Sequence, residues 1–218
     1  HYLNGIYLHK TVLENKSFLC GVATDSHRLS SCSIEIDQNI NVEPIILPKK
    51  TIFQLIFLLE ENLKNIKISM NKSKIRFDMD GGVLISKVID GRFPDYNKVI
   101  PINNDKILEI KLNEFKNSIE RVTTVSTDRK EGLKMLISKD TAKLSVNNPN
   151  SGEGVESIDA KFNSNDLNIS FNSRYLTDIT SQIESESITL YLKDPGSPVL
   201  IRDSTDKNSF HVVMPMKI

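Results

Sequence analysis

Residues 167 to 192 read LNISFNSRYLTDITSQIESESITLYL, and this stretch decides the fold. Both of its ends alternate apolar with polar side chains, which is the pattern of a half-buried antiparallel strand. Between them, from residue 173 to residue 184, Leu176, Ile179 and Ile183 recur at helical spacing, and Ser173 stands where an N-cap is expected. The stretch therefore predicts a strand, a helix and a second strand in that order.

The same order occurs a second time, in residues 44 to 89. PIILP, a helical segment, IKISM, KIRFDM and VLISKVI match LNISF, the helix from Ser173, ITLYL, PVLIRD and FHVVM of residues 167 to 214. Corresponding elements lie about 122 to 128 positions apart, and three more predicted strands precede each block. We therefore predict an α+β protein of two domains, residues 1–100 and 101–218, built from repeated units of a helix and an antiparallel meander.

Two further segments follow the helical period. Residues 113 to 126 begin with a predicted N-cap, Asn113, and their apolar residues form one stripe. The stripe consists of Phe115, Ile119, Val122 and Val125. Residues 50 to 64 are instead apolar almost all round, so we expect that helix to be largely covered.

The repeat also bears on the start of the chain. The helix predicted at residues 113 to 126 precedes the three strands of the second copy, and its counterpart in the first copy would lie before His1. The chain also opens inside an alternating segment and without an initiator Met. We therefore expect the C-terminal portion of a longer protein, with the first of the two domains incomplete at its N-terminus.

The composition excludes several classes of protein. The 218 residues are 39% hydrophobic and 26% charged, as in a folded globular protein rather than a disordered tail or a fibre. No apolar run reaches the roughly 20 residues of a membrane span, and no secretory signal pattern opens the chain, so we expect a cytoplasmic protein. Cys20 and Cys32 lie in alternating segments and are expected to be buried free thiols. The four scattered histidines give no metal-ligand spacing, and neither a metal nor a cofactor is expected.

The charge balance argues against tight binding of nucleic acid over a large surface. Twenty-eight basic residues offset twenty-eight acidic ones. A protein that neutralises many phosphates normally carries a basic excess. Either nucleic acid is therefore not a partner, or the contact with it is local and weak.

Residues 23 to 30, ATDSHRLS, contain the side-chain types of a hydrolase. Asp25, Ser26 and His27 could act as acid, nucleophile and base, and Arg28 as an oxyanion clamp. Neighbours on a strand point to opposite faces, however, so Ser26 and His27 could hardly meet in an extended chain. No G-x-S-x-G elbow surrounds Ser26. Besides a small hydrolase, the stretch could be a structural turn or part of a binding surface.

Four strings carry a resemblance to a known family: YLNG (2–5), TDSHRL (24–29), DGRFPDY (90–96) and VVMPM (212–216). Together with the repeat they resemble the bacterial sliding clamp family, the beta subunits of replicative DNA polymerase, over the whole chain. The resemblance implies the DNA clamp fold and a chain that begins in the second of three domains. It also implies a processivity factor without catalytic residues. Two full-length chains would close head to tail into a ring around duplex DNA, whose sequence is not read.

The resemblance further implies a hydrophobic cleft for short linear peptides of polymerase subunits, the clamp loader and repair proteins. Carried over residue by residue, the cleft comprises Leu3, Thr24, His27, Arg28, Leu29, Pro94, Lys98, Val99, Asn172, Tyr175, Pro198, Val212, Val213, Met214, Pro215 and Met216. The sequence departs from the family pattern at Ser26, where Gly is usual, and at Lys98, where Arg is common. Gly196 and Pro198 also differ from the expected loop residues.

Contacts with DNA and between subunits are carried over in the same way. The expected DNA contacts are His1, Tyr2, Lys49, Lys50, Lys116 and Arg121. Thr124 and Val125 fall where the family closes its ring. A peptide-binding module without a link to DNA remains a further alternative to the clamp and the hydrolase.

Overall fold

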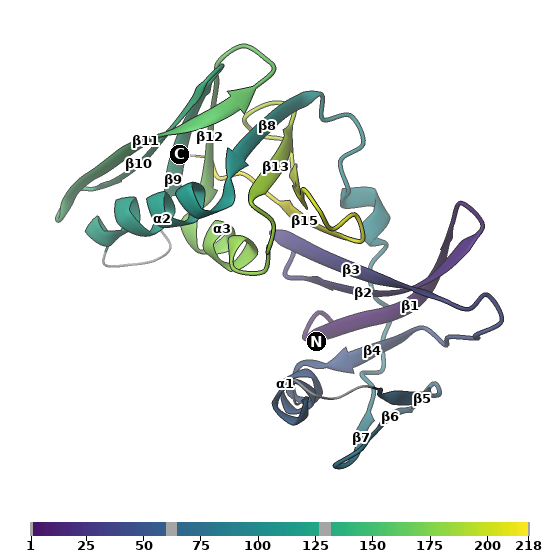
Figure 1. The fold of residues 1–218 in the computed structure, drawn as a ribbon. Helices are drawn as coiled ribbons and strands as arrows, with labels where there is room; N and C mark the ends of the chain where they lie inside the picture. The colour runs from purple at the N-terminus through teal and green to yellow at the C-terminus, as the bar shows by residue number, and fades with distance from the viewer. Residues whose placement is uncertain (1, 60–64, 127–131, 218) are drawn as a thin grey trace. The chain divides into compact units, whose positions relative to one another are not determined.

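A computed structural model describes residues 2–59, 65–126 and 132–217. The chain forms two compact units (Figure 1). The first consists of His1–Asp25 and Ser30–Asp95, and the second of Ser26–Leu29 and Tyr96–Ile218. The turn at residues 26 to 29 thus belongs to the second unit, although its neighbours in the chain belong to the first.

The part of the second unit that the structure describes consists of antiparallel strands, two α-helices and two short 3-10 helices. Its elements are η1 (Tyr96–Val99), β8 (Lys106–Lys111), α2 (Leu112–Val122), η2 (Thr123–Val125), β9 (Gly132–Ser138), β10 (Thr141–Asn148), β11 (Gly152–Phe162), β12 (Leu167–Asn172), α3 (Ser173–Thr180), β13 (Ser187–Leu192), β14 (Val199–Asp203) and β15 (Ser209–Val213). The strands follow the order β12-β9-β10-β11-β8-β13-β14-β15.

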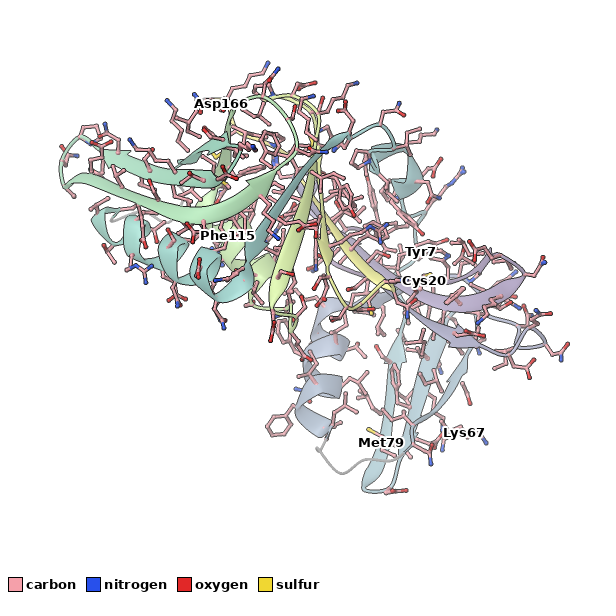
Figure 2. All side chains as sticks on the ribbon, turned by 45° about the horizontal axis from the view of Figure 1, so that its top comes forward. Tyr7, Cys20, Lys67, Met79, Phe115 and Asp166 are labelled. Carbon is pink, nitrogen blue, oxygen red and sulfur yellow. The ribbon has the colours of Figure 1, made fainter. Side chains whose placement is uncertain are left out.

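Helices α2 and α3 contact each other and close the core of this unit over its sheet. Phe115 of α2, labelled in Figure 2, is fully buried, as are Phe171 of β12 and Leu176 of α3. Burying a side chain of this size stabilises the fold by about 1.5–3 kcal/mol. The apolar stripes predicted for both helices therefore face a common core.

In its described residues, the first unit consists of two smaller sheets and one helix. Its elements are β1 (Gly5–Leu13), β2 (Lys16–Thr24), β3 (Arg28–Ile36), β4 (Ile45–Pro48), α1 (Lys49–Leu58), β5 (Lys67–Met70), β6 (Lys74–Met79) and β7 (Gly82–Lys87). The first two residues of β3 lie in the second unit. One sheet has the order β3-β2-β1-β4 and the other the order β5-β6-β7. Ile45, Leu47, Ile75 and Phe77 form a core between these elements.

The predicted repeat is confirmed by the order of the elements. The series β1, β2, β3, β4, α1, β5, β6, β7 returns as β9, β10, β11, β12, α3, β13, β14, β15. The equivalence extends to single side chains in the turns. Asn71 accepts hydrogen bonds from the backbone N–H groups of Ser73 and Lys74, and Asp194 accepts them from Gly196 and Ser197. Both residues stabilise the first turn of the meander that follows the helix.

Both predicted N-caps were wrong by one or two residues. Helix α2 begins at Leu112 with Lys111 as its N-cap, and no side chain caps it. Helix α3 has Asn172 as its N-cap, whose side-chain oxygen accepts a hydrogen bond from the N–H of Arg174 at 3.0 Å. The preceding strands run directly into the helices, so Asn113 and Ser173 already have helical backbones. Helix α3 also ends at Thr180, four residues before the predicted end.

The prediction that the apolar helix in the first unit is largely covered was also wrong. Helix α1 ends at Leu58, and residues 60 to 64 of the predicted helix lie outside the described residues. Ile52 and Leu55 pack against the core, but Phe53 and Ile56 are each 60% exposed and Phe57 is 83% exposed. The sheets of this unit cover one face of α1, and the apolar residues on its other faces remain at the surface.

The two cysteines differ, where the sequence predicted two buried thiols. Cys20 on β2 is 5% exposed, and Cys32 on β3 is exposed at the surface. Burial raises the pKa of the Cys20 thiol, and a hydrogen bond with Ser33 only partly offsets that effect. Cys32 follows the alternation of its strand, and its side chain points to the open face.

Candidate peptide-binding site

The turn at residues 25 to 27 carries an unusual backbone conformation. Ser26 has a φ of 75°, in the left-handed region. Glycine adopts this conformation without strain, whereas for other residues it costs about 1 kcal/mol. The sequence places Ser at the position where the resembling family usually has Gly. The turn therefore keeps a glycine-like backbone with a side chain on it.

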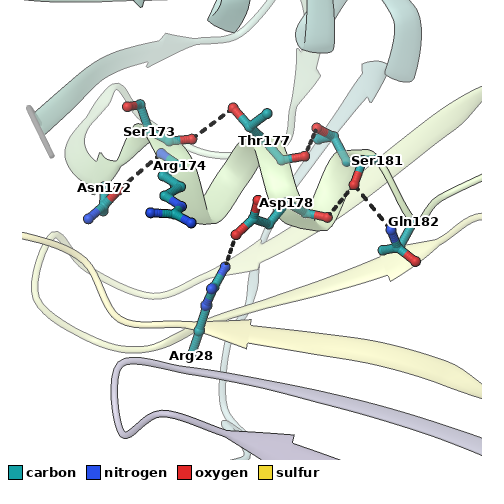
Figure 3. Close-up of polar contacts among 9 residues, drawn as sticks. Arg28, Asn172, Ser173, Arg174, Thr177, Asp178, Ser181 and Gln182 are labelled. Carbon is teal, nitrogen blue, oxygen red and sulfur yellow. Dashed lines mark hydrogen bonds and ion pairs between the residues drawn. The ribbon is translucent and has the colours of Figure 1, made fainter. Parts of the chain in front are cut away.

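Arg28 is held by helix α3 (Figure 3). Its Nη1 lies 2.6 Å from Oδ2 of Asp178, and its guanidinium carbon lies 4.4 Å from the ring centroid of Tyr175. The ring of His27 lies 6.5 Å from that of Tyr175, at an interplanar angle of 24°. A cation over an aromatic face gains about 0.5–1 kcal/mol at an exposed site. These contacts bring Tyr175 to His27 and Arg28, which lie almost 150 positions earlier in the chain, and all three were predicted for the site.

The segment after β15 joins the same cluster. The N–H of Met214 donates to the carbonyl oxygen of His27 at 2.8 Å, and the N–H of Met216 donates to the carbonyl of Ser170 at 2.7 Å. Val212 and Val213 are 3% and 0% exposed and belong to the core, whereas Met214 is 38% exposed. The surface at this end of the chain is therefore formed by residues 214 to 216, with the two valines beneath them.

A cavity of about 500 Å³ lies beside this segment. It is lined by Lys134, Asn168, Ile169, Ser170, Pro195, Gly196, Met216 and Lys217. Gly196, which departs from the resembling family, thus lines a hollow next to Met216. The lining mixes apolar and polar residues, and two cationic side chains, Lys134 and Lys217, are among them.

The remaining residues of the predicted cleft have varied surroundings. Within the second unit, Leu29 is buried, Lys98 and Val99 are exposed on η1, and Asn172 caps α3. The carbonyl oxygen of Pro198 accepts a hydrogen bond from Nδ2 of Asn104 at 2.9 Å. Leu3, Thr24 and Pro94 belong to the first unit, where Leu3 and Thr24 are half-buried and Pro94 is exposed.

Sequence reasoning missed Asp178. It lies three residues after Tyr175 on α3, so the two side chains share one helix face. The spacing of Tyr175 and Asp178 was a weak signal by itself, because nothing in the sequence indicates that Arg28 comes to that face. Only the tertiary fold pairs them.

The predicted DNA contacts differ in exposure and in the side chains that they contact. His1 lies outside the described residues; Tyr2 and Lys50 are exposed and Lys116 is half-buried. The Nζ of Lys49 lies 5.7 Å from the ring centroid of Phe53. Arg121 binds Glu156 of β11 through two hydrogen bonds, one of them 3.0 Å from Nε to Oε2. Hydrogen bonding between the two side chains raises the pKa of Arg121 and lowers the pKa of Glu156. Both groups therefore stay charged, and the negative charge of Glu156 offsets the positive charge of Arg121.

The two residues expected at the subunit contact follow α2 in η2. The hydroxyl of Thr124 donates to the carbonyl of Arg121 at 2.7 Å, and its side chain is exposed. Val125 is half-buried and packs against the core of the second unit. Glycine is required close by, because a Cβ on Gly154 would lie 2.4 Å from the carbonyl oxygen of Val122.

None of the helices in residues 2–59, 65–126 and 132–217 has both the length and the apolar character to span a bilayer. Within the same ranges, His, Cys, Asp and Glu side chains do not gather in groups of three or more that could hold a metal ion.

Comparison with protein families matches nearly all of the chain. Residues 1–95 match the central domain of the DNA polymerase III beta subunit, and residues 97–217 match its C-terminal domain. The beta sliding clamp of Caulobacter vibrioides is 33% identical over 219 residues, which covers 100% of this chain and 59% of the relative. That of Escherichia coli K12 is 31% identical over 218 residues, with 100% and 58% covered. The chain thus spans a little over half the length of these relatives.

Solved structures agree with the sequence comparison. A sliding clamp from Bartonella birtlesii bound to griselimycin is 39% identical, with a TM-score of 0.94, and covers 100% of this chain and 59% of its own. A Caulobacter crescentus beta sliding clamp with bound polyethylene glycol is 33% identical, with a TM-score of 0.96, and covers 100% and 58%. The predicted clamp fold is confirmed by these matches.

Proposed function

Since the chain belongs to the DNA polymerase III beta subunit family, we propose that it forms two domains of a cytoplasmic sliding clamp, a processivity factor rather than an enzyme. The complete protein would close head to tail into a ring on duplex DNA and tether polymerase subunits, the clamp loader and repair proteins. The domains would correspond to residues 1–100 and 101–218. No residue is assigned a catalytic role.

One observation carries the peptide-binding part of the proposal. Tyr175, Arg28 and His27 form a cluster of polar and aromatic groups, and the exposed Met214 is tied to that cluster by its backbone. Methionine adapts to varied apolar side chains, and a few polar groups around an apolar wall fix the orientation of a ligand. A short apolar peptide is the ligand that such a surface fits.

The charge supports retention by encirclement rather than by tight binding. The net charge of the chain is zero, and Arg121, one of the expected DNA contacts, is paired with Glu156. Strong neutralisation of many phosphates would oppose movement along the duplex. A ring with modest local attraction would keep its hold on DNA and still slide.

The peptide site can be tested by fluorescence polarisation with a labelled apolar peptide of Leu, Ser and Phe residues, acetylated and amidated at its ends. Met214→Ala should weaken binding by at least about fivefold, which corresponds to the loss of a binding residue worth 1 kcal/mol or more. Leu136→Ala is the matched control, because Leu136 is a similarly exposed apolar residue of the same unit at 43%. Equal affinities for both variants and the original chain would remove the site assignment.

The DNA role requires the complete protein that contains this chain. It should remain on circular duplex DNA and slide off linear DNA of the same length. Equal retention on both would contradict encirclement and favour a peptide-binding module without a link to DNA. Hydrolysis of an ester or peptide substrate that disappears in Ser26→Ala would instead favour the hydrolase.

A further inference from the structure

Arg28 is held from two directions by one face of helix α3. Tyr175 lies beneath its guanidinium, at 4.4 Å from the ring centroid, and Asp178 binds Nη1 at 2.6 Å. Residues three apart on a helix lie on the same face, so ring and carboxylate act on the guanidinium together. Figure 3 shows Arg28 reaching Asp178 on this side of α3.

The two contacts constrain Arg28 in different ways. The ring favours a guanidinium lying flat on it, and the carboxylate fixes the rotation of the group within that plane. The side chains of Arg28 and Asp178 are 29% and 46% exposed, so the pair is open to a ligand at the surface. The carboxylate also offsets the positive charge that Arg28 would otherwise present there.

A second cation lies on the same face. Arg174 precedes Asp178 by four residues, and Figure 3 shows its side chain on the side of α3 where Arg28 lies. The cluster of Arg174, Arg28 and Asp178 thus has one more positive than negative charge. Removal of Asp178 would leave Arg28 and Arg174 on this side of α3 without that carboxylate, and the surface would attract acidic groups more strongly.

We infer that Asp178 is a positioning residue of the peptide site, which holds Arg28 over Tyr175 and lowers the affinity of the site for acidic peptides relative to uncharged apolar ones. This inference rests on the proposed peptide-binding function. Arg28 then lines the site while its guanidinium is paired with Asp178. An acidic side chain in the peptide must compete with Asp178 for the guanidinium and meets the repulsion of its carboxylate.

The test measures peptide preference rather than affinity alone. The apolar peptide of Leu, Ser and Phe residues is compared with a series in which Glu replaces each residue in turn, so the register of the bound peptide need not be known. The affinity ratio of each Glu peptide to the parent is measured for the original chain and for Asp178→Asn, Asp178→Glu and Asp166→Asn. Asp166 lies on an exposed loop of the same unit and provides the matched control.

Asp178→Asn should raise the ratio for at least one Glu peptide by about two- to fivefold, the range expected for an exposed ion pair. The gain should fall as salt is raised, because exposed charges are screened. Asp178→Glu should restore the original preference, and Asp166→Asn should leave it unchanged. A role of Asp178 in folding alone would move the melting temperature without changing these ratios.

Two results would overturn the inference, and they are distinguishable. If the parent peptide binds the original chain but the ratios in Asp178→Asn are unchanged, Asp178 does not set the preference and the peptide site stands. If the parent peptide does not bind the original chain at all, the proposed function fails, and the role of Asp178 fails with it.

Discussion

Helix α1 in the first unit and helix α3 in the second occupy equivalent positions in the repeat, but their burial differs. In α3, Leu176 and Ile179 are 0% and 3% exposed, and α2 packs beside them. In α1, Phe57 is 83% exposed, although α1 is the more apolar helix. Burial of a helix in this fold therefore depends on the elements that pack against it more than on its own composition.

The strands show the same difference. In the second unit, β13 pairs with β8 on one side and β14 on the other, whereas in the first unit β5 is the edge of its three-stranded sheet. Strand β8 and helix α2 are consecutive in the chain. Among the described residues of the first unit, no segment takes the two positions that β8 and α2 hold in the second. Strand β8 and helix α2 thus account for the different pairing of β13 and β5 and for the different burial of α3 and α1.

The largest effect on stability is expected in the core of the second unit, where helix α2 packs against it. Phe115→Ala removes a fully buried ring from the contact of α2 with the core and should lower the free energy of unfolding by about 3–5 kcal/mol. Urea denaturation, with hydrogen exchange read separately in each unit, would measure it. A loss under about 1 kcal/mol would mean that α2 is not needed to complete this core.

A smaller effect is expected where β11 passes close to the end of α2. A Cβ on Gly154 would lie 2.4 Å from the carbonyl oxygen of Val122, whereas a Cβ on Gly82 in the first unit would meet nothing within 4 Å. Gly154→Ala should cost about 1–3 kcal/mol, as overpacking does, and Gly82→Ala should stay within about 1 kcal/mol of the original. Thermal denaturation of the two variants checks the difference, and equal costs would contradict the close approach.

Acid should affect the second unit through Asp203. Burial alone would raise the pKa of this carboxyl, but hydrogen bonds from Thr205, Ser185 and Asp206 outweigh it and hold the pKa well below its usual range. The unfolded chain therefore binds more protons than the folded one below about pH 4, and stability falls as the pH drops through that range.

Asp203→Asn should make the second unit less sensitive to acid between about pH 5 and pH 2. Hydrogen exchange at several pH values measures this, and Asp80→Asn, in a turn of the first unit, serves as the control. An unchanged pH dependence in Asp203→Asn would show that another group dominates acid unfolding.

The smallest effect is expected on the exposed face of α1. Phe57→Ala makes the same chemical change as Phe115→Ala, but at an exposed position, and should alter stability by no more than about 0.5 kcal/mol. The pair of variants compares one substitution in two environments. A cost of several kcal/mol for Phe57→Ala would show that this face is covered in solution, and analytical ultracentrifugation would then test for a second copy.

Local patterns predicted the elements well, because alternation and helical spacing are short-range properties. Both meanders and all three helices follow from them. The ends of the helices were less predictable, as Asn172 rather than Ser173 caps α3. Exposure on α1 could not be read from its sequence, since it depends on which other segments reach it.

In the candidate site, too, contacts between distant segments could not be predicted from the sequence. The resemblance named Arg28, His27, Tyr175 and Met214, and the structure brings these residues together. It did not name Asp178, because the partner of Arg28 lies 150 positions away in the chain. An ion pair over that separation follows only from the folded arrangement. The roles of these residues in binding a peptide stay predictions, as do the DNA and subunit contacts.

The unequal burial of the two cysteines provides a chemical handle. Cys32 is at the surface, whereas Cys20 is buried and its raised pKa leaves less of the reactive thiolate. A maleimide dye at neutral pH should therefore attach to Cys32 alone, without any substitution in the chain. Since the chain contains no tryptophan, tryptophan emission would not overlap the fluorescence of the dye.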